Sequence, residues 1–461
     1  MNWRHALKEQ ENHLLNDLVK LLSIKSVKDP ATFSKEAPVG LKIKAALDYM
    51  LQLAQAHGFR THNIDGLVGY AEIGPETAKE YIAILCHLDV VPATGEWSSD
   101  PFSPIIKEGK LFARGAIDDK GPTMAAYYAI KLIKESGFSL QHRIRIIFGT
   151  DEESGMSCMK KYIKVEPKPL AGFAPDAVFP IIHAEKGQIN AIIKYKGSKK
   201  GQIRSFYSGE KGNMVPDYAE AVISSSKAQA LILSDFNTFF QNEHQTATIK
   251  IENDKIHFTL KGVSAHGMEP EKGINAGTKL AFFLADLLPE EPFIQFISAR
   301  LHERHNGEGL NIFFTDKVTG PLTVNPGTFR YSEGEGAISL NIRCPVETPY
   351  LRTIEKLTEV IKEYGFDIEE VREKKPHFVD EHQPVIKILQ HAYELETGEN
   401  AKLLTTGGAT YAQFIENGVA YGAVFPGKEN TAHQINEYII LEDLYKAASI
   451  YATAIYRLAN I

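Results

Sequence analysis

The feature that most constrains the fold is an alternation of strand-like and helical segments near the start of the chain. Residues 81–86 form a short, continuous apolar run, and residues 143–148 form a second strand-like segment. Between them, residues 120–135 have helical periodicity and stop before Gly137. Continuous apolar runs are typical of parallel strands that are buried on both faces. The pattern therefore predicts an α/β domain with a mostly parallel twisted sheet and helices on both faces.

The pattern changes after about residue 185. Short strand-like segments with alternating polarity, such as 248–251 and 256–260, alternate with two helical stretches, 216–241 and 273–288. Such alternation is typical of sheets with one exposed face. The α/β pattern then returns, with a strand over 419–425 and a helix over 441–458. We therefore expect one α/β domain, formed by 1–185 and 382–461, to be interrupted by an inserted α+β domain over 186–381 that has room for two related halves.

Composition excludes several classes of protein. The chain has 461 residues, a formal net charge of −7 and only three cysteines, which is an odd number. It contains no run of ~18 apolar residues that would span a membrane, and no apolar core of a signal peptide at the N-terminus. No basic stripe offers a surface for nucleic acid. We therefore expect a cytoplasmic enzyme with reduced cysteines, no membrane partner and no nucleic-acid partner.

Acids and imidazoles gather where the predicted strands end. They are His87-Leu88-Asp89, Asp118-Asp119, Asp151-Glu152-Glu153, Pro175-Asp176 and His433. Each cluster alone has an ordinary explanation, such as a solvated turn or a helix N-cap. Together they are expected to converge, because the carboxyl ends of parallel strands share one edge of the sheet. Histidines and carboxylates suit zinc or a comparable divalent ion, and a bridging carboxylate permits two ions.

Other catalytic schemes fit the sequence less well. The chain has no G-x-S-x-G, Walker A or G-x-G-x-x-G motif. Cys86 is a conceivable nucleophile, but a cysteine inside an apolar strand is more often an inert part of the core.

The order and spacing of the clusters resemble the di-zinc metallopeptidase family of aminoacylase, carboxypeptidase G and succinyl-diaminopimelate desuccinylase, and within it the dipeptidase branch of the PepV type. The matching motifs are His87-Leu88-Asp89-Val90-Val91-Pro92, Arg114-Gly115-Ala116-Ile117-Asp118-Asp119-Lys120-Gly121, Thr150-Asp151-Glu152-Glu153 and Pro175-Asp176. The branch is further indicated by Asn213-Met214-Val215-Pro216-Asp217, Ala265-His266-Gly267-Met268 and Gly407-Gly408-Ala409-Thr410-Tyr411-Ala412. The resemblance implies a zinc exopeptidase-like catalytic domain with an inserted lid domain.

The resemblance also implies roles for the clustered residues. One divalent ion would be held by His87, Asp118 and Asp176, and the other by Asp118, Glu153 and His433. Asp118 would be the bridging ligand and would precede a cis peptide bond to Asp119. Glu152 would act as the general base toward the water that bridges the ions, and Asp89 would orient His87.

Further roles fall on the inserted domain and the segment after it. His266 would polarise the scissile carbonyl, and Asn213 and Arg343 would help to hold the peptide. The loop of Gly408, Ala409 and Thr410 would border the substrate carboxylate. Ala409 departs from the family, which tends to have glycine there.

The expected activity is that of a metal-dependent dipeptidase which cleaves short unprotected peptides. An N-acyl-amino-acid deacylase or metallocarboxypeptidase on the same fold is the alternative, and the long insert favours the dipeptidase. A metal-binding protein without turnover is disfavoured by the presence of Glu152. Zinc is the expected metal, with manganese and cobalt left open. We expect a monomer, because the insert is long enough to supply His266 within one chain.

Overall fold

The computed structural model describes residues 2–224, 229–241, 247–252 and 254–461. The chain forms two compact units. Unit 1 contains residues 1–184, 378–405 and 409–461, and unit 2 contains residues 185–377 and 406–408. Among the described residues, no helix is both long and apolar enough to cross a membrane.

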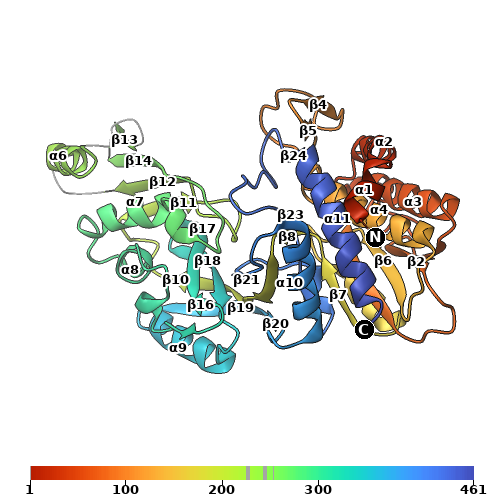
Figure 1. Ribbon diagram of the computed structural model, residues 1–461. Helices are drawn as coiled ribbons and strands as arrows, with labels where there is room; N and C mark the ends of the chain where they lie inside the picture. The colour runs from red at the N-terminus through yellow and green to blue at the C-terminus, as the bar shows by residue number, and fades with distance from the viewer. Residues whose placement is uncertain (1, 225–228, 242–246, 253) are drawn as a thin grey trace. The chain divides into compact units, whose positions relative to one another are not determined.

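Unit 1 is built on a nine-stranded sheet (Figure 1). In spatial order the strands are β1 (Arg60–Ile64), β2 (Val68–Ile73), β6 (Arg143–Gly149), β3 (Tyr81–His87), β7 (Ala171–Ala174), β22 (Gly418–Ala420), β9 (Ile181–Glu185) and β20 (His377–Phe378), with β21 (Leu403–Thr406) paired to β9. The four strands β6, β3, β7 and β22 are parallel, whereas β1, β2 and β9 join as antiparallel neighbours. The parallel arrangement expected from the sequence is thus confirmed at the centre of the sheet, and its flanks are antiparallel.

Helices cover both faces of this sheet. They are α1 (Trp3–Lys8), α2 (Glu11–Leu22), α3 (Leu41–Ala56), α4 (Lys120–Ser136), α5 (Ser157–Val165), α10 (Pro384–Thr397) and α11 (Leu441–Leu458). Every residue of β3 is buried, and its side chains alternate between two hydrophobic clusters. Ile82, Ile84 and Cys86 join the cluster that contains α4 and α11, and Tyr81, Ala83 and Leu85 join the cluster beneath α5. Burial on both faces explains why the sequence of this strand is continuously apolar.

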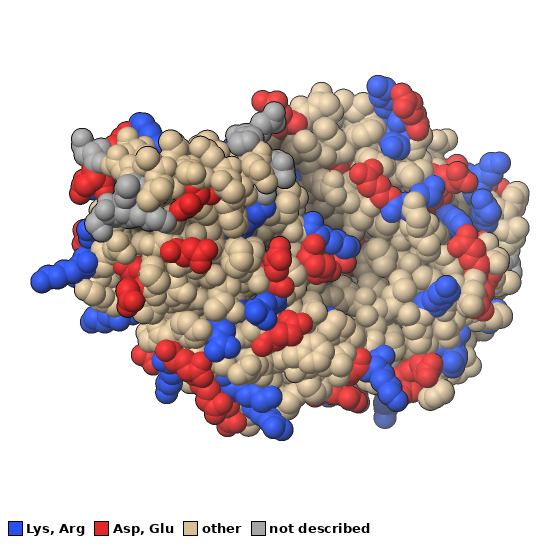
Figure 2. Space-filling model, turned by 90° about the vertical axis from the view of Figure 1, so that its left-hand side faces the viewer, with Lys and Arg blue, Asp and Glu red and all other residues tan. Residues whose placement is uncertain are grey.

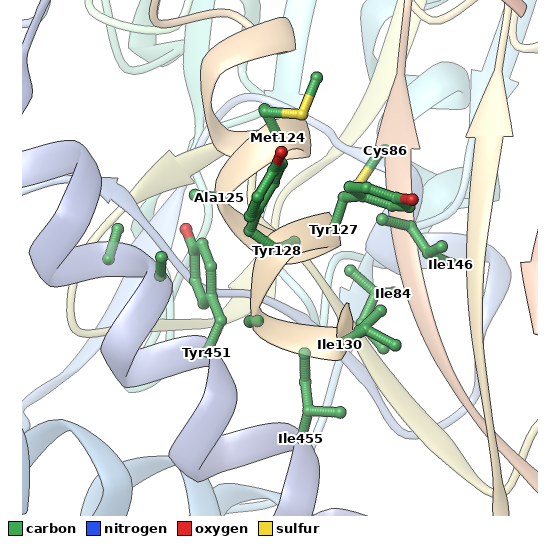
Figure 3. Packing of buried hydrophobic residues seen from close by; sticks show 14 of the residues in the cluster. Ile84, Cys86, Met124, Ala125, Tyr127, Tyr128, Ile130, Ile146, Tyr451 and Ile455 are labelled. Atoms are coloured by element: carbon green, nitrogen blue, oxygen red, sulfur yellow. The ribbon is translucent and has the colours of Figure 1, made fainter. Parts of the chain in front are cut away.

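Figure 3 shows the α4 side of this packing. Ile84, Cys86 and Ile146 project from the central strands toward α4, and Tyr451 of α11 faces Tyr128. Full burial of one such aliphatic side chain contributes about 1.5–3 kcal/mol. This packing fixes where β3 and β6 end, and therefore where the polar residues that follow them lie.

Smaller strands complete unit 1. β4 (Ile105–Lys107), β5 (Lys110–Phe112) and β24 (Tyr438–Ile440) form a three-stranded sheet, and β8 (Ala177–Val178) pairs with β23 (Ala423–Val424). The single strand expected over 419–425 is therefore two short strands, β22 and β23. They separate at Gly422, whose φ of +85° lies in the region that favours glycine.

Unit 2 is built on an antiparallel eight-stranded sheet. In spatial order its strands are β13 (Ala247–Glu252), β14 (Lys255–Lys261), β12 (Tyr218–Ser224), β11 (Ile203–Ser208), β17 (Thr323–Ser332), β18 (Glu335–Cys344), β10 (Gly187–Lys196) and β19 (Phe366–Lys374). Its helices are α6 (Gln229–Phe239), α7 (Ala276–Ala285), α8 (Pro292–Phe296) and α9 (Tyr350–Lys362). Alternate residues of β10, from Ile189 to Tyr195, are buried in one hydrophobic cluster, as expected for α+β architecture.

The helix expected over 216–241 is wrong in its first part. Residues 218–224 form β12 between β11 and β14, and α6 begins only at Gln229. Residues 225–228 lie outside the described part. The alanines and glutamate of this segment suit a helix by propensity, but Ala219, Ala221 and Ile223 are buried at every second position. A period of two belongs to a strand, and sheet pairing overrides the weak helical preference.

Figure 2 shows one face of the molecule, on which lysines and arginines are interspersed with aspartates and glutamates. The visible face carries no broad area of a single charge, in line with the absence of a basic stripe in the sequence.

Candidate metal centre

The ends of three adjacent parallel strands in unit 1 supply the polar residues of the site. β3 ends at His87, β6 is followed by Glu152 and Glu153, and β7 is followed by Asp176. β3 pairs in parallel with both β6 and β7, so the three carboxyl ends lie at one edge of the sheet. Asp118 joins them from the turn that precedes α4.

The imidazole and carboxylate groups lie as close together as the ligand atoms around one metal ion. His87 Nε2 lies 3.0 Å from Asp118 Oδ1 and 3.7 Å from Asp176 Oδ2. His433 Nε2 lies 3.0 Å from Asp118 Oδ2 and 3.1 Å from Glu153 Oε1. The two oxygens of Asp118 therefore face one imidazole each.

Two overlapping sets in this group have the composition and spacing of a metal site. Potential ligand atoms of His87, Glu152 and Asp176 lie within 4.8 Å of one another, as do those of His87, Asp118 and Glu153. The five residues expected to ligate metal lie at this place, and Glu152, the expected base, lies among them. The side chain of His433 is 54% exposed and that of His87 only 1%, so the group opens to solvent on the His433 side.

The hydrogen bonding of His87 provides a test of whether the residues fit a metal ion. Its Nδ1 lies 2.9 Å from the main-chain carbonyl of Asp89, which can only accept a hydrogen bond. In the neutral imidazole, Nδ1 then carries the proton and Nε2 carries a lone pair. That buried Nε2 lies between two carboxylates, which outweigh the effect of burial and raise the pKa of His87 well above its ordinary value, so a cation is favoured at this atom. A metal ion that takes the place of the proton on Nε2 would be shared by the imidazole and the two carboxylates, and the bond at Nδ1 is typical of metal-bound histidine.

The pKa values of the carboxyl groups show how crowded the negative charges are. Burial, and then the charge of Asp176, raise the pKa of Glu152 well above its ordinary value. Burial and the charge of Asp118 raise the pKa of Glu153 to about 7, despite the hydrogen bond to His433. Burial also acts to raise the pKa of Asp118, but the two imidazoles outweigh it and the pKa is lowered. Divalent cations would relieve this repulsion between carboxylates.

Asp89 is bonded in a way that sequence reasoning does not anticipate. Its Oδ1 accepts a hydrogen bond from the main-chain N–H of Glu152, and its Oδ2 accepts one from Glu153, each at 3.1 Å. Its carboxylate also lies 3.6 Å from His87 Nδ1, although its own carbonyl is the nearer acceptor. The carboxylate of Asp89 thus holds the main chain of Glu152 and Glu153, beside the imidazole.

The peptide bond between Asp118 and Asp119 is cis, which confirms the expectation drawn from the resemblance. The side chain of Asp119 is buried. Its Oδ2 accepts hydrogen bonds from the main-chain N–H of His87 and from the hydroxyl of Thr123, both at 3.0 Å. Asp119 had no role assigned from sequence, and its place next to Asp118 in the motif was the available clue.

Unit 2 brings a second group of expected site residues together. The main-chain N–H of Gly267 donates to the carbonyl of Asn213 at 2.7 Å, and Met214 and His266 form an isolated antiparallel bridge. His266 Nδ1 accepts a hydrogen bond from the N–H of Met268 at 3.1 Å, which leaves the ring proton on Nε2 in the neutral form.

Arg343 is tied to the glycine loop of the same unit. It is buried, its Nη1 donates to the carbonyl of Gly407 at 2.8 Å, and its Nε donates to Asn341 Oδ1 at 2.8 Å. A Cβ added to Gly407 would lie 2.7 Å from Cβ of Met268, so this loop also packs closely on the His266 segment. Burial lowers the pKa of Arg343 to about 10, and the guanidinium stays charged at neutral pH.

The three loop residues Gly408, Ala409 and Thr410 divide between the units. Gly408 belongs to unit 2, and Ala409 and Thr410 belong to unit 1. Thr410 is nearly buried, and its hydroxyl accepts a hydrogen bond from the N–H of Ala412 at 3.1 Å. This bond caps the short 3-10 helix that starts at Tyr411.

Comparison with known proteins supports an enzymatic role for the chain. Residues 83–457 match the model of peptidase family M20/M25/M40. Two bacterial proteins that carry the name "Putative dipeptidase" are similar over the full chain: YtjP of Bacillus subtilis (strain 168), 42% identical with 100% of both chains covered, and SH1171 of Staphylococcus haemolyticus (strain JCSC1435), 39% identical with 99% of both covered.

The fold is shared with more distant structures as well. The crystal structure of human carnosine dipeptidase 1 superposes with a TM-score of 0.59 at 14% identity, covering 99% of this chain and 98% of that one.

Proposed function

Because the chain belongs to peptidase family M20/M25/M40, we propose that it is a metal-dependent dipeptidase that hydrolyses short unprotected peptides. The names of its full-length relatives favour this activity over N-acyl-amino-acid deacylation or carboxypeptidase activity on the same fold. The observation that carries the proposal is the buried Nε2 of His87, which lies 3.0 Å from Asp118 Oδ1 and 3.7 Å from Asp176 Oδ2.

The ligand set proposed from sequence would accommodate two ions. His87, Asp118 and Asp176 would hold one, Asp118, Glu153 and His433 would hold the other, and zinc suits this mixture of imidazole and carboxylate best, with manganese or cobalt as alternatives. The position of Asp118 between His87 Nε2 and His433 Nε2 supports its role as the bridge. Divalent ions bound here would supply Lewis acidity toward the peptide carbonyl and toward water.

Glu152 is the proposed general base. It lies in the same group as His87 and Asp176, and neither of the proposed ligand sets includes it. Its carboxylate would take the proton of the attacking water and then deliver it to the amine that leaves. Asp89 would keep this base in place, because its carboxylate holds the main chain of Glu152 and Glu153 beside the imidazole of His87.

The residues of unit 2 are proposed to act on the substrate. The hydrogen bond at His266 Nδ1 places the ring proton on Nε2, which is the form needed to donate to the oxygen of the scissile carbonyl. Asn213 and the charged Arg343 would hold the peptide, and Gly408, Ala409 and Thr410 would border its carboxylate. Unit 2, which corresponds closely to the insert over 186–381, would then act as a lid.

The remaining parts of the proposal concern the state of the protein. We propose a monomer that supplies His266 within one chain, and a cytoplasmic location, which suits three buried free cysteines. The partner is a small peptide.

The proposal is tested with metal-free protein that is reconstituted separately with zinc, manganese and cobalt. Each form is assayed on dipeptides, tripeptides and N-acylated amino acids. Amine release from dipeptides, restored by at least one metal, is the expected result. Preferential cleavage of acylated amino acids would favour the deacylase alternative, and metal binding without hydrolysis of any substrate would contradict an enzymatic role.

A further inference from the structure

Glu437 and Arg114 form a buried ion pair in unit 1 that the proposed reaction does not use. Arg114 Nη1 lies 2.6 Å from Glu437 Oε2, and the two side chains are 2% and 0% exposed. The guanidinium also lies over the ring of Trp97, 5.0 Å from its centroid. Burying two charges carries a large desolvation cost, and a buried pair by itself gives little net stability. The place of this pair in the fold indicates a further role.

The second oxygen of Glu437 is bonded to the main chain of the proposed bridging ligand. Glu437 Oε1 accepts a hydrogen bond from the N–H of Ile117 at 2.9 Å and another from the N–H of Asp118 at 3.2 Å. Residues 113–119 form neither a helix nor a strand, so no regular ladder fixes their main chain. The Glu437 carboxylate supplies that constraint, and Arg114 holds the carboxylate in place from the other side.

Glu437 also lies at the end of the loop that carries His433. Its main-chain carbonyl accepts a hydrogen bond from the N–H of Ala113 at 3.1 Å, next to the pairing of β24 with β5. The loop is closed at its base by Thr431, whose hydroxyl donates to the carbonyl of Tyr438 at 3.0 Å. Glu437 thus joins the turn that carries Asp118 to the loop that carries His433.

These two segments meet at one proposed metal site. Asp118 Oδ2 and His433 Nε2 lie 3.0 Å apart, and both belong to the site that Glu153 completes. The other site shares Asp118, but its two further ligands are anchored differently, because His87 ends β3 and Asp176 follows β7, two paired strands.

We propose that Glu437, held by Arg114, is a positioning residue that sets the distance between Asp118 and His433 and so maintains the metal site of Asp118, Glu153 and His433. The inference rests on the proposed function, since it concerns the same centre. Glu437 touches no substrate in this account and acts only through the main chain of Asp118 and the loop of His433. Loss of its contacts weakens that site more than the site of His87 and Asp176.

Three variants separate the contacts of Glu437. Glu437→Ala removes all of them. Glu437→Asp keeps the negative charge near Arg114, but its shorter side chain does not reach the N–H groups of Ile117 and Asp118. Glu437→Gln keeps the shape, but its single oxygen cannot serve both Arg114 and those N–H groups. The Gln variant also keeps the test informative if the Ala variant does not fold.

A matched control is available in the same unit. Glu72 is a buried carboxylate on β2 that accepts hydrogen bonds from Arg60, Arg143 and Arg145. Glu72→Gln removes a buried charge in the same way and is expected to lower the melting temperature without changing metal binding.

The experiment is calorimetric titration of each metal-free protein with zinc ion alone, with circular dichroism to verify folding and kcat on a dipeptide as a second readout. Wild type is expected to bind two equivalents. The Glu437 variants are expected to bind the first normally and the second about 10- to 100-fold more weakly, as is typical when a residue that supports a ligand is removed. The Glu72 control should bind both as wild type does.

Several outcomes overturn the inference. Unchanged affinity for both equivalents in folded Glu437→Gln and Glu437→Asp would show that the pair serves stability only. Equal weakening in the Glu72 control would attribute the effect to general destabilisation, and a wild type that binds no second ion would remove the site in question. Wild-type binding of two ions without dipeptide cleavage would instead refute the proposed function, and the titrations would still decide the role of Glu437.

Discussion

The two units hold their polar side chains by different means. In unit 1 the carboxylates of Asp118, Glu153 and Asp176 crowd around two imidazoles at 3.0–3.7 Å, so charged groups depend on one another. In unit 2, Arg343 donates to the main chain of Gly407 and to the side chain of Asn341, and His266 accepts from the main chain of Met268. The clustered carboxylates of unit 1 repel one another unless a cation lies between them. The polar groups of unit 2 are held by hydrogen bonds within the chain. The difference supports the proposed division of roles, in which unit 1 carries the metal chemistry and unit 2, together with Ala409 and Thr410 of unit 1, contacts the substrate. Each prediction tests that division.

The largest effect is expected for Asp118→Ala. Asp118 faces both imidazoles, so its loss should disrupt both proposed ion sites together. Turnover should fall by more than about 10⁴-fold, because Lewis acidity and general-base catalysis fail at once. Elemental analysis and kcat measured on the same sample check this, and a variant that keeps two ions would show that Asp118 is not the bridge.

Glu152→Gln should separate catalysis from metal binding within unit 1. The amide keeps the shape of the side chain but cannot accept a proton, so kcat should fall by about 10²–10⁴-fold while metal content stays near that of wild type. Wild-type kcat in this variant would mean that another residue is the base. A loss of metal instead would identify Glu152 as a ligand, as its proximity to His87 and Asp176 allows.

His266→Ala tests the role given to unit 2. If Nε2–H donates to the oxygen on which negative charge develops, kcat and kcat/KM should both fall by about 10²–10³-fold. Metal content should not change, because no expected ligand lies in unit 2. A raised KM with an unaltered kcat would restrict His266 to substrate binding and would remove the main support for a catalytic lid.

Metal removal should destabilise unit 1 selectively. An ion present at about 100 times its Kd stabilises the folded state by about 2.7 kcal/mol, and this contribution is lost on chelation. Hydrogen exchange should therefore rise in unit 1 around His87 and Asp118 and stay constant in the sheet of unit 2. Equal changes in both units would contradict the division between them.

The smallest effect is expected for Arg343→Lys. The lysine keeps the positive charge but loses the paired bonds to Gly407 and Asn341, so the loop and the peptide contact should loosen. We expect KM to rise by about 10-fold with little change in kcat or metal content. A fall in kcat with constant KM would place Arg343 nearer to the reacting atoms.

The sequence predicts the metal region well, for a physical reason. Strands β3 and β6 are recognisable from their apolar residues, and polar residues that follow parallel strands must share one edge of the sheet. The placement of His87 and Glu153 follows from those two facts. Asp118 lies in the turn before α4. Periodicity does not locate this residue, and the prediction came from the motif that contains it.

The parts that sequence reasoning missed depend on contacts between distant segments. Arg114 and Glu437 are 323 residues apart, and no local pattern reveals that their side chains meet. The helix expected over 216–241 failed for a related reason, because pairing with β11 and β14 decides that 218–224 is a strand. The role of the Asp89 carboxylate also required the fold, since its partners lie after a different strand.

Anomalous diffraction from zinc-loaded crystals, recorded at the zinc absorption edge, tests the central claim most directly. The account predicts two peaks on opposite sides of the Asp118 carboxylate, one next to His87 and Asp176 and the other next to Glu153 and His433. The absence of peaks between these side chains, or zinc bound only elsewhere in the molecule, would contradict it.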